Sequence, residues 1–115
     1  MELKLNVYTD KKLSEVEKTY TCNDFEISLA VAEDILDLVN VDMFTNKLTE
    51  DEQFTMLIKL VVGGKDKFKD LVKNVFVDLT DDELKRTKLK DFVKVVYNII
   101  VYAIAGLTSI ADEKN

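Results

Sequence analysis

Two short runs of carboxylates, at positions 50–52 and 81–83, are the densest groups of potentially reactive side chains in the sequence. Paired carboxylates can act as a general acid and base, or can hold a cation. Each run, however, directly follows a threonine, Thr49 or Thr80, and ends in a glutamate three positions after it. This is the capping-box pattern, and acidic side chains are stabilised in the first turn of a helix. The runs therefore predict two helix starts rather than a catalytic or calcium-binding site.

The segment Gly63-Gly64-Lys65 has the composition of a phosphate-binding loop but not its spacing. A Walker loop needs a glycine five positions before the glycine that precedes the lysine, and a serine or threonine after the lysine. Those two positions hold Lys59 and Asp66. We therefore expect the two glycines to end a helix, by adopting the left-handed turn that glycine tolerates.

Nucleophilic and metal chemistry lack their usual residues in this sequence. The chain has no histidine and a single cysteine, Cys22. A reactive thiolate usually has a basic partner, and a structural zinc site needs several Cys or His ligands. We therefore expect Cys22 to be a small, partly buried side chain. We also expect the protein to act without catalysis, a cofactor or a bound metal ion.

The composition indicates one acidic globular domain. Among 115 residues there are 22 acidic and 16 basic side chains, for a net charge of −6, and 47% of the residues are hydrophobic. Because Arg86 is the only arginine, a basic face for nucleic acid is not expected. The most apolar stretch, over 95–107, is shorter than the roughly 20 residues of a membrane span, and residues 1–8 do not resemble a signal peptide. We therefore expect a soluble intracellular protein that binds neither nucleic acid nor membrane.

Alternating apolar and polar residues at the N-terminus predict a β-hairpin over residues 1–22. The apolar face of its first strand consists of Leu3, Leu5 and Val7. A second strand over 16–22 has an apolar side made of Val16, Tyr20 and Cys22, which Lys18 interrupts. A lone hairpin is only marginally stable in water. We therefore expect its apolar face to cover helices.

Helical periodicity follows over 23–111. We expect a first helix that is capped by Asn23 or Asp24 and ends near Val41, with Met43 and Phe44 folded beneath it. Further helices are expected to start after Thr49, Gly64 and Thr80 and around Lys88, and residues 112–115 to fray. The predicted fold is α+β, with an N-terminal β-hairpin packed on a bundle of about four to five helices in a single domain of residues 1–115.

The last predicted helix is apolar nearly all round over 95–107. Such a helix is either central to the core or covered by another chain. We hypothesise that it contacts a partner protein, and that two phenylalanines near the third helix form a second patch. The hypothesised contact set is Phe92, Val96, Tyr97, Ile100, Val101 and Ile104, with Phe68 and Phe76 as the second patch.

Three segments carry a family resemblance that extends over most of the chain. Their sequences are VAEDILDLV at 31–39, LVVGG at 60–64 and FVDLTDDELKRTK at 76–88. Together with the N-terminal hairpin, they resemble the small tail assembly chaperones of long, non-contractile-tailed phages and prophages of Gram-positive bacteria. The resemblance implies a non-enzymatic protein of the host cytoplasm that is absent from the mature virion. Such proteins bind the tape measure protein and keep it soluble while tail tube subunits assemble around it.

The resemblance also implies that the chain is made in two lengths. In the longer form, a programmed backward frameshift adds an extension that recruits the major tail tube protein. Glu113-Lys114-Asn115 can be encoded as GAA AAA AAC, on which a ribosome can slip back by one base. An AAG codon at Lys114, with no overlapping downstream frame, would contradict this hypothesis.

Two functions from different classes fit the sequence. In the first, the apolar last helix covers apolar stripes on a tape measure helix or pairs with a second copy of the chain, while the acidic surface keeps the assembly soluble. In the second, the chain is an acidic phage-encoded regulator that binds a host protein. Gene position discriminates them, because a chaperone gene lies between the genes for the major tail protein and the tape measure protein.

Overall fold

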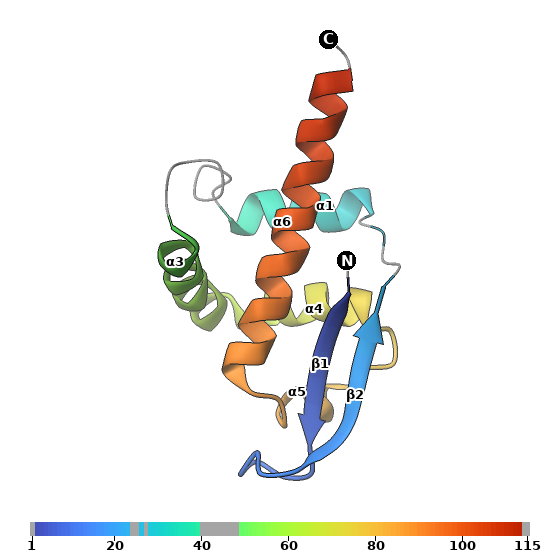
Figure 1. Cartoon of the computed structure of the whole chain (residues 1–115), viewed down its shortest axis with the longest axis vertical. Helices are drawn as coiled ribbons and strands as arrows, with labels where there is room; N and C mark the ends of the chain where they lie inside the picture. The colour runs from blue at the N-terminus through green and yellow to red at the C-terminus, as the bar shows by residue number, and fades with distance from the viewer. Residues whose placement is uncertain (1, 24–25, 27, 40–48, 114–115) are drawn as a thin grey trace.

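The computed structural model describes residues 2–23, 26, 28–39 and 49–113, with the backbone alone at Lys65 and over 106–113. The described residues form an antiparallel hairpin followed by helices that pack around a long C-terminal helix (Figure 1). This is the predicted α+β fold, in which the hairpin lies against the helices.

The hairpin consists of β1 (Leu3–Tyr8) and β2 (Val16–Cys22), with Leu3 opposite Cys22 and Leu5 opposite Tyr20. Leu3, Leu5 and Val7 are buried, as the alternation predicts. Val16 was expected on the same side as Tyr20 but is about half exposed. The reason is a β-bulge between Val7 and Tyr8 in the pairing, which changes the register before Val16 is reached.

Helix α1 (Leu29–Leu38) begins later and ends earlier than expected. Its cap is Ser28, whose side chain accepts a hydrogen bond from the Val31 N–H, so the expected cap at Asn23 or Asp24 is wrong. The helix ends before Val39, which has extended backbone angles. Met43 and Phe44 lie outside the described residues, and so does the expected helix end at Val41.

Helix α3 (Glu50–Gly63) and helix α4 (Lys65–Val75) follow each other with only Gly64 between them. The predicted capping box at Thr49 and Glu52 is confirmed. The predicted helix end at the two glycines is also confirmed, but the expected left-handed turn is wrong. Gly64 has φ −119° and ψ 39°, and neither Gly63 nor Gly64 has a positive φ. The chain therefore turns here by leaving helical geometry for one residue, without a conformation that needs glycine.

Replacing Gly63 with Ala is expected to stabilise the protein by about 0.5 kcal/mol, because alanine reduces the entropy of the unfolded chain and favours the helix. A Cβ atom at this position meets nothing within 4 Å. The matched control is Gly64→Ala, whose Cβ would touch Leu60 O and the Phe68 ring at 3.5 Å. Urea unfolding measures both variants, and a loss of stability in Gly63→Ala would contradict the described backbone.

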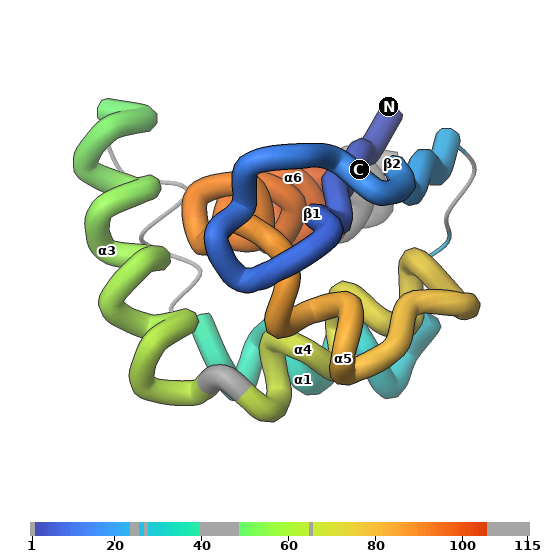
Figure 2. The backbone as a smooth tube through the Cα atoms, turned by 90° about the horizontal axis from the view of Figure 1, so that it is seen from below, coloured from blue at the N-terminus to red at the C-terminus, as the bar shows by residue number. Residues whose placement is uncertain are grey.

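Helix α5 (Asp81–Leu84) is a single turn with the second predicted capping box, between Thr80 and Glu83. The last helix, α6 (Leu89–Glu113), begins near the expected residue and extends two residues past the expected end. Seen along α6, the hairpin covers one side of it and α3, α4 and α5 lie around the others (Figure 2). Four side chains of α6 are fully buried in this arrangement: Val93, Val96, Ile99 and Ile100. The core of the protein is therefore built around the first half of α6.

Candidate functional site

The hypothesised contact set does not form a surface in this structure. Three of its members on α6 and both phenylalanines of the second patch are at least nine-tenths buried: Phe92, Val96 and Ile100, with Phe68 and Phe76. Tyr97, Val101 and Ile104 are partly buried. The structure thus corrects the assignment for the five buried residues, because elements of the same chain surround the first half of α6, and Phe68 and Phe76 pack into the same core.

Tyr97 joins α6 to α3 within this core. Its hydroxyl donates a hydrogen bond to Gln53 Oε1 at 2.8 Å, and its ring meets the Phe54 ring edge-on at a centroid distance of 6.5 Å. Burial raises the pKa of Tyr97, so the hydroxyl keeps its proton and remains a donor. Tyr97 therefore packs against the core and links α6 to α3, with part of its side chain still exposed.

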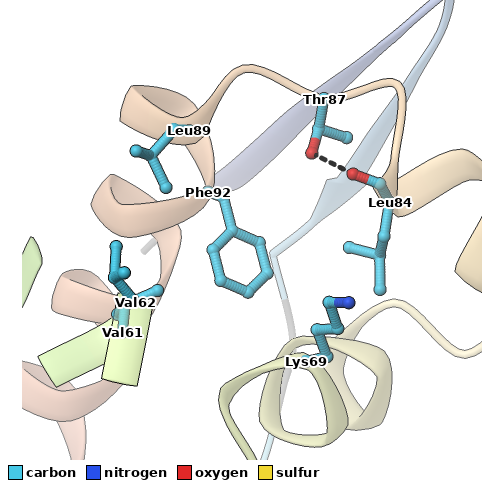
Figure 3. A pocket seen from close by; sticks show the side chains of 7 residues that line it. All are labelled: Val61, Val62, Lys69, Leu84, Thr87, Leu89 and Phe92. Atoms are coloured by element: carbon cyan, nitrogen blue, oxygen red, sulfur yellow. Dashed lines mark hydrogen bonds between the residues drawn. The ribbon is translucent and has the colours of Figure 1, made fainter. Parts of the chain in front are cut away.

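An apolar pocket opens where the end of α3, the side of α4, the segment after α5 and the start of α6 come together (Figure 3). Its volume is about 340 Å³, at the lower end of the range of ligand pockets. The lining residues are Val61, Val62, Lys69, Leu84, Thr87, Leu89 and Phe92. Because five of these seven side chains are hydrophobic, the pocket suits one or two apolar side chains of a partner.

Two lining residues leave apolar surface in solvent. Val62 is 61% exposed and Leu89 is 54% exposed, whereas Phe92 between them is 8% exposed. Leu89 is only three positions before Phe92 on α6, yet it is exposed because the helix begins there, beyond the reach of the core. Sequence reasoning missed Val62, although there was a signal: this valine lies outside the buried stripe of its amphipathic helix. The exposed pair makes the pocket a candidate docking site.

Two of the lining residues, Thr87 and Lys69, are polar. The Thr87 hydroxyl donates to Leu84 O at 2.8 Å, so this hydroxyl is already engaged within the chain. Lys69 is half-buried, and its side chain extends from α4 beneath Phe92, with Nζ toward Leu84 (Figure 3). The amine is near enough to Asp81 to contribute to its lowered pKa, although the main cause is the hydrogen bond from Lys73. Lys69 therefore adds a positive charge to an otherwise apolar site.

The second carboxylate run has a structural role that goes beyond its capping box. Glu83 is 8% exposed and accepts hydrogen bonds from the Tyr20 hydroxyl at 2.6 Å and from the Thr80 N–H at 3.0 Å. Lys18 Nζ lies 3.1 Å from its other oxygen. Burial alone would raise the pKa of Glu83, but the hydrogen bonds from Tyr20, Lys18 and Thr80 outweigh it and lower the pKa to about 2. We call Lys18, Tyr20, Thr80 and Glu83 the Glu83 clamp.

The single arginine is also part of the contact between the hairpin and α5. Arg86 Nη1 lies 2.7 Å from both Tyr8 O and Glu17 Oε2, and Nη2 lies 3.1 Å from Asp82 Oδ2. In return, the Tyr8 N–H donates to Arg86 O at 2.8 Å. The carboxylates at 82 and 83 and the only arginine are therefore engaged in holding the hairpin on the helices, beside the pocket rather than in it.

A groove between β1 and α6 is the main alternative site, with a volume of about 300 Å³. Its lining contains acidic side chains, basic side chains and amides, together with one valine: Glu2, Lys4, Asn6, Asp91, Lys94, Val95 and Asn98.

Among the described side chains, no three of His, Cys, Asp or Glu are grouped so that they could hold a metal ion. No helix in the described part of the chain has both the length and the apolar character needed to cross a membrane.

Comparisons with models of protein families, with curated proteins and with solved structures each found no match to this chain. What the protein does must therefore be inferred from its own residues. The pocket between α3, α4 and α6 is the feature that best fits binding, because it combines an apolar lining with exposed apolar side chains at its mouth.

Proposed function

We propose that this chain is a non-enzymatic tail assembly chaperone that binds the tape measure protein of a phage or prophage through the apolar pocket. The observation that carries the proposal is the exposure of Val62 and Leu89 at the mouth of the pocket. Exposed apolar side chains around a concave site are typical of surfaces that bind protein segments. The sequence resemblance supplies the identity of the client.

The proposed mechanism is shielding of apolar helical surface. A tape measure protein is a long helix with apolar stripes, and such stripes associate with one another in water. Docking one apolar turn of the client in the pocket removes it from water, and the net charge of −6 makes neighbouring chaperones repel one another. The protein would act in the host cytoplasm, and would leave before the virion is complete.

Two further parts of the proposal come from the same resemblance. Copies of the chain would associate along the client, and a longer form made by frameshifting near Lys114 would recruit the major tail tube protein. The nucleotides that encode residues 113–115 test the second part directly. A slippery run of adenines followed by an overlapping reading frame is the expected result.

Leu89→Asp is expected to reduce binding of the tape measure protein by about 5- to 30-fold, which corresponds to about 1–2 kcal/mol for an important contact residue. The substitution should leave the fold intact, because Leu89 is more than half exposed and an acidic residue is favourable in the first turn of α6. The measurement is co-expression with the tape measure protein of the same genome, followed by pull-down and assay of soluble client.

The matched control for this experiment is Val77→Asp. Val77 is 83% exposed but does not line the pocket, so the same kind of charge is introduced elsewhere on the surface. Equal client solubility with Leu89→Asp and Val77→Asp would contradict the role of the pocket. Absence of any interaction between the unchanged chain and the tape measure protein would contradict the proposed function itself.

A further inference from the structure

Charge is distributed unevenly between the pocket region and the rest of the chain. Over 65–94, which includes α4, α5 and the start of α6, there are nine basic and seven acidic residues. The remaining positions have seven basic and fifteen acidic residues. The region that contains most of the pocket lining is therefore net positive on a protein that is acidic elsewhere.

Several carboxylates of this region are neutralised by partners within the chain. Asp81 lies 2.9 Å from Lys73 Nζ, and Asp82 lies 3.1 Å from Arg86 Nη2. Glu83 is paired with Lys18 of the hairpin. The carboxylates of α5 are thus engaged with cations that do not line the pocket, and they do not form direct ion pairs with Lys69. A partner that approaches the pocket therefore meets the positive charge of Lys69.

The position of Lys69 suits recognition of a carboxylate beside an apolar side chain. Lys69 is part of the lining, and its side chain passes beneath Phe92 with the amine directed toward Leu84 (Figure 3). Val62 and Leu89 border the pocket on its other side (Figure 3). On a helical partner, residues three or four positions apart lie on the same face. A helix that inserts one apolar side chain near Leu89 can therefore present a carboxylate to Lys69 from the adjacent turn.

We propose that the pocket selects an acidic amphipathic helix, in which a large apolar side chain enters between Val62, Leu89 and Phe92 and a Glu or Asp three or four residues away pairs with Lys69. This inference rests on the proposed function for the identity of the partner, and adds which segment of it is bound. Charge complementarity at a partly exposed site contributes modestly to affinity but decides among segments that are equally apolar.

The test uses two synthetic helical peptides of about 18 residues, long enough to form helix when bound. Both carry the same leucine stripe, and they differ only in having Glu or Lys four residues after the central leucine. Fluorescence anisotropy with the full chain should show that the Glu peptide binds about three- to tenfold more tightly, as expected for one partly exposed ion pair. Lys69→Glu should reverse the preference, and Lys69→Met should abolish it while retaining binding.

The matched control is Lys67→Glu, which makes the same charge change at an exposed residue of α4 that does not line the pocket. It should keep most of the preference for the Glu peptide. Equal binding of the two peptides to the unchanged chain, or equal effects of Lys67→Glu and Lys69→Glu, would overturn the inference.

Failure of the inference can be distinguished from failure of the proposed function. If neither peptide binds but the chain still solubilises the tape measure protein, the charge-selective pocket is wrong and the chaperone function stands. If the Glu peptide binds in the predicted way but the tape measure protein does not, the pocket is correct and the proposed client is wrong.

Discussion

Ile100→Asp is expected to unfold the protein rather than to weaken partner binding alone. Ile100 is fully buried on α6, and an aspartate there would lose apolar burial and place an unpaired carboxylate in the core. The combined effect should exceed about 4 kcal/mol, which is comparable to the whole stability of many small domains. Circular dichroism should show loss of helix, and the cooperative thermal transition should disappear.

The control for this experiment is Ala105→Asp, on the same helix but exposed. It should change the free energy of unfolding by less than about 1 kcal/mol, mainly through the lower helix propensity of aspartate. Should Ile100→Asp remain folded with unchanged helix content and lose only client binding, α6 would be a contact surface, as the sequence first indicated, and the described core would be wrong.

Glu83→Gln is expected to destabilise the protein by about 2–3 kcal/mol at pH 7, because hydrogen bonds to a charged group contribute about this much. The amide retains the size of the side chain but loses the charge that Tyr20, Thr80 and Lys18 stabilise. Urea unfolding monitored by circular dichroism measures the change. Tyr20→Phe should reproduce part of it, since it removes the 2.6 Å hydrogen bond and leaves the carboxylate in place.

The effect of Glu83→Gln should depend on pH in a defined direction. The folded protein lowers the pKa of Glu83 from 4.5 to about 2, so the folded state binds this proton more weakly than the unfolded state. The stabilisation is therefore complete above pH 4.5 and is lost as the pH falls toward 2. The difference in stability between the unchanged chain and Glu83→Gln should decrease over this interval.

The matched control is Glu52→Gln in the other capping box. Glu52 makes the same kind of hydrogen bonds to its threonine cap, Thr49, but it is exposed. The control should therefore cost less than about 1 kcal/mol, as for an ordinary cap. Equal effects of Glu52→Gln and Glu83→Gln would show that Glu83 acts as a local cap only, and that the Glu83 clamp does not hold the hairpin to α5.

Lys18 illustrates where strand periodicity alone misleads. In the sequence it is a charged residue that interrupts the apolar side of β2. In the structure its amine pairs with Glu83 and lies 4.6 Å from the centre of the Tyr20 ring. The partner is 65 positions away along the chain, so no local pattern identifies it. Lys18 thus breaks the apolar pattern of β2 because it makes a tertiary contact with Glu83, where the hairpin meets α5.

Local chemistry determined the capped starts of α3 and α5, the hairpin and the helix end at the two glycines, because capping, alternation and the low helix propensity of glycine act within a few residues. It also determined that the stretch over 95–107 had to be covered, since it is apolar nearly all round. Only the tertiary structure decided what covers it. Burial of Phe92, Val96 and Ile100 depends on how far β1, α3 and α4 wrap around α6, and exposure of Leu89 depends on where that wrapping stops. The pocket exists at this boundary because the end of α3, the side of α4 and the start of α6 meet there, and periodicity within one element carries no information about where its neighbours end.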